Sequence, residues 1–343
     1  MGRTVGAVAL AAVAAMTLGV SMGQAQDAAG FYKGKTVKFV VGFGTGGGFD
    51  AYARMIGPPL AKLLDATVVV ENQPGAGGLI ALNRVAASPA DGLTMMIVDG
   101  TPAALGQLLG TENVRYDLAK LDHLGMINST RFVWLVAATS PVTSLADVIK
   151  AGAKVRWGAA GPIDGPAGTA GVACEALRIT CQVIVGYKGS SDMILAMQRG
   201  EIDANFLSDS SSSTLVQSKQ ARAIAVMSRE RSKLLGDVPT LFEGAKLDKE
   251  QEWWLDFRAN LNDLGRILVT TGGTPADRIA FLRGAVKKVL TDSALVEEGG
   301  KTGRPLDFQE PEVARKKAVS VLEGITSDEK ERIRNVALKK YVQ

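Results

Sequence analysis

Short apolar runs alternate with helical patterns through most of this 343-residue chain, and this alternation restricts the folds open to it. Between residues 36 and 100 we expect three strands, with a helix between each pair. The strands lie at 36–43, 66–72 and 94–100, and the helices at 49–64 and 77–88. Parallel strands joined by crossover helices produce this order of elements, so the segment predicts an α/β unit with a parallel sheet.

The same alternation returns between residues 154 and 227. Here we expect strands at 154–161, 181–187, 201–208 and 221–227, and helices at 168–178, 190–200 and 213–220. Residues 131–152 are predicted to be a strand and a helix that pass between the units, and a C-terminal helix is expected at 274–290. The fold class is therefore α/β with two lobes around a cleft. We expect lobe I at 26–130 plus 228–343 and lobe II at 131–227, with two chain crossings.

The first 25 residues differ from the rest of the chain. Arg3 precedes an uncharged run from Thr4 to Val20, and small residues at 23–25 follow at a typical cleavage spacing. This pattern predicts a secretory signal peptide at 1–25 and a periplasmic mature protein. A membrane anchor is the alternative, although about 17 mostly small residues are at the short limit for a span. No later segment is long and apolar enough to cross a bilayer.

Charge and composition exclude some classes of partner. The chain has 39 basic and 35 acidic side chains, and removal of Arg3 leaves 38 − 35 = +3. A charge this small, with basic residues scattered along the chain, does not indicate a nucleic-acid-binding protein.

Cys174 and Cys181 are the two cysteines of the sequence. An unbroken helix would place their Cα atoms about 10.5 Å apart, which is too far for a disulfide. A turn at 178–180 would let the chain double back, and an oxidising compartment would then favour the bond. The residues alone leave a disulfide and two buried thiols as equal alternatives.

The loop after the first predicted strand contains Gly42, Gly44 and Gly47 in the spacing G-x-G-x-x-G. A dinucleotide site is one interpretation, because a strand precedes the loop, a helix follows it, and Glu71 ends the second strand where a ribose-binding acid would lie. An exported protein would not meet a pool of nicotinamide cofactor, however. The phosphate-binding lysine of a P-loop is also missing, since Phe49 and Asp50 follow the glycines.

A second glycine-rich loop, at 71–78, follows the next strand and leads into the next helix. Two such loops on neighbouring strands would gather unpaired main-chain N–H groups of helix N-termini at one edge of the sheet. We expect this arrangement to bind an anion without the help of an arginine. The alternative is that the glycines only permit tight turns. Asp50 and Arg54, four residues apart, are expected to form an ion pair within the first helix.

Four consecutive stretches resemble a known family: "VKFVVGFGTGGGFDAYAR", "VVVENQPGAGGLIALNRVAASPADGLTM", "GYKGSSDMILAMQRGEID" and "ARAIAVMSRERSKLLGDVPTLFE". They are similar to the signatures of the extracytoplasmic solute receptors of tripartite tricarboxylate transporters, also called Bug-type receptors. The resemblance implies a two-lobed periplasmic binding protein fold that is type II-like. It also implies capture of a small organic carboxylate, such as a di- or tricarboxylate or an aromatic acid, for a membrane permease. It implies no catalysis and no cofactor.

The resemblance also implies binding positions. In the first loop these are Phe43, Gly44, Thr45, Gly46 and Gly47, and in the second loop Gly75, Ala76, Gly77 and Gly78. In the other lobe Gly168 and Thr169 match the family's glycine and hydroxyl pair, where Thr169 would cap a helix and face the ligand. Tyr187 is a further candidate, although Gly186 stands where the family often has proline.

Residues 208–213, "SDSSSS", follow a predicted strand and lie where open α/β sheets usually bind ligands. Either Ser208 or Asp209 is expected to reach the substrate, with Asp209 accepting a hydrogen bond from a donor group; the alternative is a linker or capping segment. Trp253 and Trp254 would shape a cleft wall or pack in the core.

Enzyme hypotheses find little support in the residues. His123, the single histidine, has no recognisable partner and is expected to be structural, and we expect no metal site. The sequence contains no H-E-x-x-H, paired-cysteine metal spacing or G-x-S-x-G motif. We therefore expect a monomeric binding protein. A nicotinamide-dependent oxidoreductase and a receptor that feeds a sensor kinase remain as alternatives.

Overall fold

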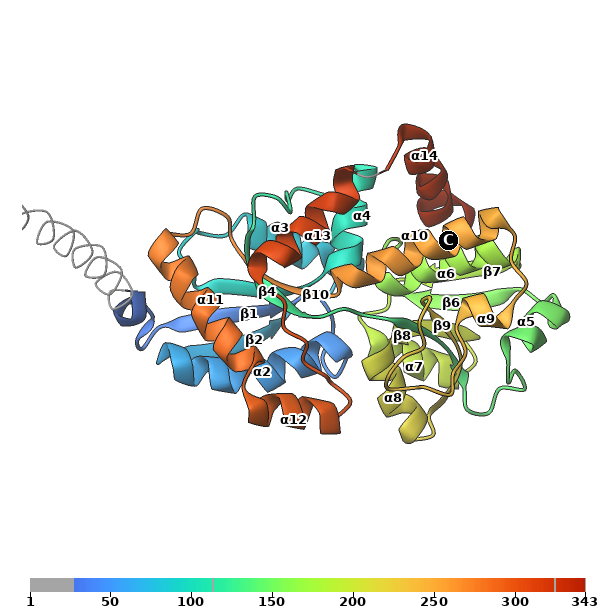
Figure 1. Ribbon diagram of the computed structural model, residues 1–343, viewed down its shortest axis with the longest axis horizontal. Coiled ribbons are helices and arrows are strands. Elements are labelled where there is room, and N and C mark those ends of the chain that lie inside the picture. Colours follow the sequence, from blue (N-terminus) through green and yellow to red (C-terminus); the bar gives the residue numbers. More distant parts are fainter. Residues whose placement is uncertain (1–27, 113, 324, 343) are drawn as a thin grey trace, which may run out of the picture.

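The computed structural model describes residues 28–112, 114–323 and 325–342, so the predicted signal peptide lies outside the described residues. The described chain contains two five-stranded sheets that lie side by side along the long axis (Figure 1). The first has the order β2-β1-β3-β10-β4: β1 (Thr36–Val41), β2 (Thr67–Asn72), β3 (Thr94–Asp99), β4 (Asp122–Asn128) and β10 (Arg266–Thr270). The second has the order β7-β6-β8-β5-β9: β5 (Phe132–Ala137), β6 (Val155–Ala159), β7 (Cys181–Val185), β8 (Ala204–Ser208) and β9 (Ala221–Met227).

The two sheets share one topology. In each sheet, the first three strands of the spatial order are parallel to one another. The fourth strand is antiparallel and pairs with the third strand on one side and with the outermost strand on the other. The antiparallel strand is β10 in the first sheet and β5 in the second, and each is the first strand that the chain forms after it crosses from the other sheet. No repeat in the sequence indicated this symmetry, because strand order depends on pairing and not on local residue identity.

Helices cover both faces of the sheets (Figure 1). Those of the first half are α2 (Gly48–Leu64), α3 (Leu79–Ala86), α4 (Gly100–Leu109), α5 (Leu145–Ala151), α6 (Gly165–Leu177), α7 (Ser190–Gln198) and α8 (Asp209–Gln217), with a 3-10 turn at Ala76–Gly78. Those of the second half are α9 (Leu241–Gly244), α10 (Lys249–Leu261), α11 (Ala276–Leu290), α12 (Ser293–Lys301), α13 (Pro311–Glu323) and α14 (Ser327–Asn335), with a 3-10 turn at Asn262–Leu264 and a π-helical turn at Val336–Lys340. No described helix is long and apolar enough to cross a membrane.

One apolar core runs through both sheets. It joins Met96 of β3 to Trp134, Trp157 and Phe206 of the second sheet through the helices between them. The Trp157 and Phe206 rings stack with centroids 4.8 Å apart. A second cluster, on the opposite face of the first sheet, packs against α2 and α11. Because the core continues from one sheet to the other, the sheets are held in a defined relative position.

The C-terminal part of the chain contacts both sheets. Helix α13 packs on β4 and α4 of the first sheet, whereas α10 and the π-helical turn pack on α6 beside the second. A bridge between Val183 and Val342 adds the end of the described chain to β7. The lobe boundaries stay a prediction. The C-terminal part of the chain connects the two sheets, because it packs against elements of both.

Two helices begin earlier than predicted, for the same reason. Helix α6 begins at Gly165 because the Asp164 side chain accepts a hydrogen bond from Ala167 N, and α8 begins at Asp209 because Ser208 caps it. The serine run at 210–213 is therefore helical. Strands β4 and β10 were not predicted, since β4 contains Asp122, His123 and Gly125, which weaken a strand pattern.

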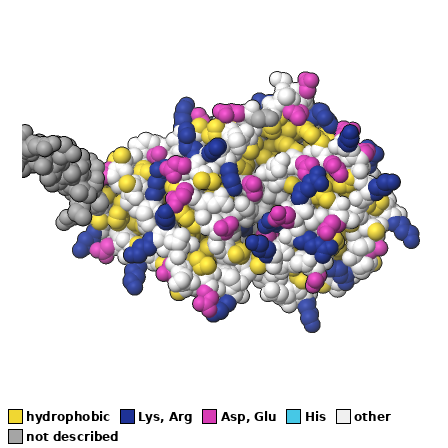
Figure 2. Space-filling view, in the orientation of Figure 1, with side chains coloured by type: hydrophobic (Ala, Val, Ile, Leu, Met, Phe, Trp, Pro, Cys, Tyr) yellow, Lys and Arg dark blue, Asp and Glu magenta, His cyan; other side chains and the backbone are white. Residues whose placement is uncertain are grey.

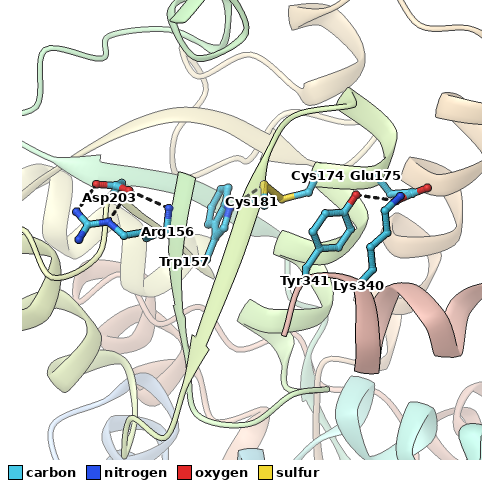
Figure 3. The surroundings of a disulfide bond; sticks show 8 residues. All are labelled: Arg156, Trp157, Cys174, Glu175, Cys181, Asp203, Lys340 and Tyr341. Carbon is cyan, nitrogen blue, oxygen red and sulfur yellow. Dashed lines mark hydrogen bonds and ion pairs between the residues drawn. A yellow bond between two sulfur atoms is a disulfide. The ribbon is translucent and has the colours of Figure 1, made fainter. Parts of the chain in front are cut away.

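The structure contains the disulfide between Cys174 and Cys181, at the end of α6 and the start of β7 (Figure 3). Arg178 ends the helix in the left-handed region, with a φ of 54°, and this reverses the chain within the predicted turn. Trp157 Nε1 donates to Cys181 Sγ at 3.4 Å, and the hydroxyl of Tyr341 donates to Glu175 Oε2 at 2.7 Å. Figure 3 shows that the C-terminal turn is thereby tied to the helix that carries the disulfide.

Candidate ligand-binding cleft

Two adjoining cavities lie between the two sheets. The outer cavity has a volume of about 360 Å³ and is lined by Gly46, Gly47, Gly48, Tyr52, Ser190, Ser191, Ile194, Leu195, Gln198, Leu207, Ser210, Ser211, Thr214, Leu215, Gln220 and Arg304. The inner chamber has a volume of about 60 Å³ and is lined by Phe43, Gly47, Gly48, Phe49, Asp99, Thr130, Phe132, Asp164, Pro166, Ser190, Met193, Leu207, Ser208, Ser211 and Arg266. The shared residues show that the cavities adjoin around Gly48, with the first sheet's elements on one side and the second sheet's on the other.

Helix α2 begins in the cleft, and no side chain of the described residues caps its N-terminus. Its N-cap is Gly47, which has no side chain to bond the first-turn N–H groups. Asp50 in the first turn is buried and accepts from Gly46 N at 2.9 Å, and it forms the predicted ion pair with Arg54 at 2.9 Å. Burial favours a raised pKa for Asp50, but the hydrogen bonds from Arg54 and Gly46 outweigh it and lower the pKa. The carboxylate of Asp50 is thus paired with Gly46 N and Arg54, and the N-terminus of α2 can still attract an anion.

The second sheet supplies two more helix N-termini. Helix α7 is capped by Gly189 and again lacks a side-chain cap, while α8 is capped by Ser208 through Ser211 N. Serine hydroxyls from both helices line the outer cavity. Three helix N-termini therefore meet there, and the charged side chain in its lining is Arg304. Partial positive charge and hydroxyl donors without a facing carboxylate favour an anionic ligand group.

Arg266, the first residue of β10, is 1% exposed and lines the inner chamber. Its Nη1 donates to Asn128 Oδ1 at 3.0 Å and to Thr130 Oγ1 at 3.2 Å, and its Nη2 donates to Ser210 Oγ at 3.4 Å. Its Nε has no partner in the described chain. The expectation that the anion site needs no arginine stays a prediction, although the chamber contains Arg266, a buried cation that has no ion-pair partner among the described residues.

Two acids also line the inner chamber, the partly exposed Asp99 from the first sheet and the buried Asp164 from the second. Asp99 caps α4 and accepts from Thr101 N at 3.2 Å, and burial raises its pKa to about 6. Asp164 caps α6 and accepts from three main-chain N–H groups, those of Ala160, Gly161 and Ala167. Burial raises the pKa of Asp164 and these hydrogen bonds oppose the rise. Neither acid was expected from the sequence, because no helix was predicted to begin at either position.

Arg258 of α10 lies behind these acids and is fully buried. It donates to Thr169 Oγ1 at 2.9 Å, to Gly165 O at 3.3 Å and to Asn262 Oδ1 at 2.9 Å. Burial lowers the pKa of Arg258 to about 10, while Asp99 and Asp164 oppose the fall. The prediction that Thr169 caps the helix is wrong, because Asp164 is the cap and the Thr169 hydroxyl donates to Gly165 O.

The second glycine loop contacts the other lobe instead of lining either cavity. Gly75, Ala76, Gly77 and Gly78 all have positive φ. A Cβ on Gly161 would lie 2.7 Å from Gly77 N, and one on Gly77 would lie 2.7 Å from Asp164 Cβ. This close approach of main chains is what the glycines permit. A ligand contact by this loop stays a prediction.

The other predicted positions are divided between the cavities and their surroundings. Phe43 and Ser208 line the inner chamber, and Gly46 and Gly47 line the outer cavity. Five of these positions lie outside both linings: Gly44, Thr45, Gly168, Tyr187 and Asp209. The N–H of Gly44 donates to Lys188 O at 2.7 Å, and Asp209 accepts from Ser232 Oγ at 3.0 Å. Thr45 is exposed, and Gly168 faces Leu105. Burial raises the pKa of Asp209. A role in binding for these positions stays a prediction.

The surroundings of the first loop do not support a dinucleotide. Gly44 N is already bonded to the other lobe, and Glu71 pairs with Lys38 at 3.5 Å.

His123 is buried, with Nε2 2.9 Å from Leu118 O, and Trp254 packs in the core. Across the described ranges, no group of three or more His, Cys, Asp or Glu residues is placed to hold a metal. Figure 2 shows basic and acidic side chains interspersed over this face of the molecule.

Comparison with known proteins identifies the family and the fold. Residues 52–317 match the family model described as the tripartite tricarboxylate transporter family receptor. BugT of Bordetella pertussis is 26% identical over 291 residues, which cover 83% of this chain and 85% of BugT. The solved structure of the periplasmic binding protein BugD has a TM-score of 0.76 and 21% identity, and covers 91% of this chain and 100% of BugD.

A further solved structure is MatC from Rhodopseudomonas palustris with bound malate. It has a TM-score of 0.70 and 22% identity, and covers 88% of this chain and 99% of MatC. These likenesses confirm the predicted two-lobed periplasmic binding protein fold. Since the family model spans most of the sequence, the chain belongs to the tripartite tricarboxylate transporter receptor family.

Proposed function

We propose that this protein is a periplasmic receptor that captures a small organic carboxylate and delivers it to the permease subunits of a tripartite tricarboxylate transporter. The observation that carries the proposal is Arg266, a buried guanidinium without an ion-pair partner in the described chain, beside three helix N-termini in an interlobe cleft. A buried charge is costly unless a partner neutralises it, and an organic acid is such a partner. Membership of the receptor family and the malate bound to MatC support this class of ligand.

Contacts between the lobes indicate how the site would work. Gly44 N donates to Lys188 O across the cleft, and the main chains of Gly77 and Gly161 lie against each other. We infer that these contacts belong to a closed state and that a ligand between the lobes stabilises it. A permease would then recognise the closed form, since it presents one defined surface from two lobes.

Two features of the chain bear on the compartment in which the protein acts. The N-terminal pattern predicts export, and the Cys174–Cys181 disulfide suits an oxidising compartment. We therefore propose that the mature protein is periplasmic, that it binds without catalysis, and that it acts as a monomer.

A thermal-shift screen of mono-, di- and tricarboxylates, aromatic acids and amino acids, each at millimolar concentration, tests the proposal. At least one acid is expected to raise the unfolding midpoint, and calorimetry should then give saturable binding at one site. If NADH raises the midpoint and no acid does, the receptor proposal is wrong and the oxidoreductase alternative gains support.

A further inference from the structure

An acid and a base lie directly opposite each other in the inner chamber. Asp99 ends β3 and Arg266 begins β10, and the two are partners in the antiparallel register of these strands. Opposite charges at directly opposed positions normally pair. Within the described chain, however, neither an ion pair nor a hydrogen bond joins these two side chains, although both line the chamber.

The guanidinium of Arg266 makes its hydrogen bonds to three other polar side chains. Nη1 uses its donors on Asn128 and Thr130, and Nη2 makes one long bond to Ser210. Nε is buried and has no partner in the described part of the molecule. Nε and Nη2 form the edge through which a guanidinium binds a carboxylate with two parallel hydrogen bonds, so a ligand that reached this edge would use hydrogen-bond capacity that the described residues leave unfilled.

Only one of the two carboxylate oxygens of Asp99 accepts a hydrogen bond from the described residues. Its Oδ1 accepts from Thr101 N, and the described residues supply no donor to its Oδ2. This Oδ2 lies close to Gly165, since a Cβ added to Gly165 would be 3.1 Å from it. Asp164, the other acid of the chamber, differs because main-chain N–H groups satisfy both of its oxygens. Asp99 is therefore the acid that has acceptor capacity left for a ligand.

We propose that the inner chamber binds a carboxylate that carries a hydrogen-bond donor close to it, with the carboxylate on Arg266 and the donor on Asp99. The donor is an ammonium or a hydroxyl group, so the ligand class is amino acids or hydroxy acids. This inference rests on the proposed function, because it names the ligand of the same cleft. The rest of the ligand extends past Gly48 into the outer cavity, where Ile194, Leu195 and Leu215 form an aliphatic wall.

Two further features favour a donor over a second anionic group in the chamber. A ligand carboxylate placed against Asp99 would meet a like charge in a buried site, which is unfavourable. The walls are formed in part by Phe43, Phe49 and Met193, whose apolar side chains offer Asp99 no hydrogen-bond donor. Burial raises the pKa of Asp99, and a ligand donor would offset this cost of its charge.

Matched ligand series test the inference by calorimetry at pH 7.5. Each series keeps one carbon skeleton: propanoate, lactate and alanine; succinate, malate and aspartate; glutarate, 2-hydroxyglutarate and glutamate. In at least one series, the hydroxy or the amino acid is expected to bind at least about tenfold more tightly than the unsubstituted acid, as for a charge-assisted hydrogen bond. The two substituted members of each series distinguish the hydroxyl from the ammonium donor.

The Asp99→Asn variant removes the acceptor charge and keeps a good helix cap. It should reduce the preference to about threefold or less while the unsubstituted acid binds as before or more tightly. Asp248→Asn is the matched control, because Asp248 also caps a helix through its side chain but is exposed and outside both cavity linings. This control should retain the wild-type preference.

The outcomes separate the inference from the proposed function. If no acid of any series or of the wider carboxylate screen binds, the proposed function fails and the inference fails with it. If acids bind but the unsubstituted members bind as tightly as the substituted ones, the inference alone is overturned. A preference that persists in a folded Asp99→Asn variant also overturns it, and the wild-type series decides the matter if that variant does not fold.

Discussion

The inner chamber and the outer cavity adjoin, yet they offer a ligand different kinds of groups. The outer cavity presents helix N-termini, serine hydroxyls and the partly exposed Arg304. The inner chamber presents side-chain charges from β3, β10 and the start of α6, of which Arg266 and Asp164 are buried. Main-chain donors recognise negative charge in general, whereas an acidic and a basic side chain at fixed positions distinguish one ligand acid from another. We therefore expect affinity for carboxylates to be shared between the cavities and selectivity to lie in the inner chamber.

The largest effect is expected from Arg266→Gln, which removes the buried cation. Loss of one partner of a buried charge pair costs about 3–5 kcal/mol, so carboxylate affinity should fall by more than about a hundredfold. Calorimetry with the best acid of the screen measures this change. Arg266→Lys is the companion variant, and it should recover part of the affinity because it keeps the charge and loses the two-bond edge.

A thermal melt of both Arg266 variants shows whether they fold, since the side chain also bonds Asn128, Thr130 and Ser210. Wild-type affinity in a folded Arg266→Gln variant would show that the outer cavity alone binds the acid.

Gly48→Ala is expected to have the next largest effect, because Gly48 lies where the two cavities join. An added Cβ would lie 2.7 Å from Ser211 Oγ and 3.7 Å from Arg266 Nη2. Overpacking of this kind costs about 2 kcal/mol, which corresponds to a loss of roughly thirtyfold in affinity. Gly284→Ala on α11 is the control, since its Cβ would meet nothing within 4 Å, and it should leave binding unchanged.

Asp99→Asn should stabilise the ligand-free protein at neutral pH. Burial raises the pKa of Asp99 to about 6, and Arg258 and Arg266 only partly oppose this, while Asp164 is the facing acid. A raised acid pKa means that the stability present below about pH 4 is lost as the pH rises through 6. The variant should therefore gain roughly 1–2 kcal/mol at pH 7.5, and denaturant melts should show this gain disappear towards pH 4. A constant difference across this range would contradict the raised pKa of Asp99.

Arg304→Ala should give the smallest effect. Arg304 lines the outer cavity and is partly exposed, and it donates to Thr302 O. A charge in contact with solvent contributes about 0–1 kcal/mol, so affinity should fall by no more than about fivefold and the fall should shrink in high salt. A loss as large as that of Arg266→Gln would reverse the assignment of the two cavities.

Local features of the fold could be predicted from particular residues. The strand-to-helix alternation, the glycine turns before α2 and α3, and the Asp50–Arg54 pair depend on residues near one another in the chain. Strands β4 and β10 escaped prediction, because their residues form strands through pairing with each other and with β3. Four of the predicted site residues, Phe43, Gly46, Gly47 and Ser208, line the cavities. Their contacts with a ligand stay predictions.

The sequence by itself determined the α/β class, the two glycine loops and the family signatures, because periodicity, turn chemistry and motif spacing are local properties. Only the tertiary structure decided that Asp99 and Arg266 face each other, that Arg258 lies behind them, and that the second glycine loop seals one lobe against the other. These relations join segments far apart in the chain. They depend on which strands pair and which main chains come close enough to touch, and neither leaves a signal in any short stretch of residues.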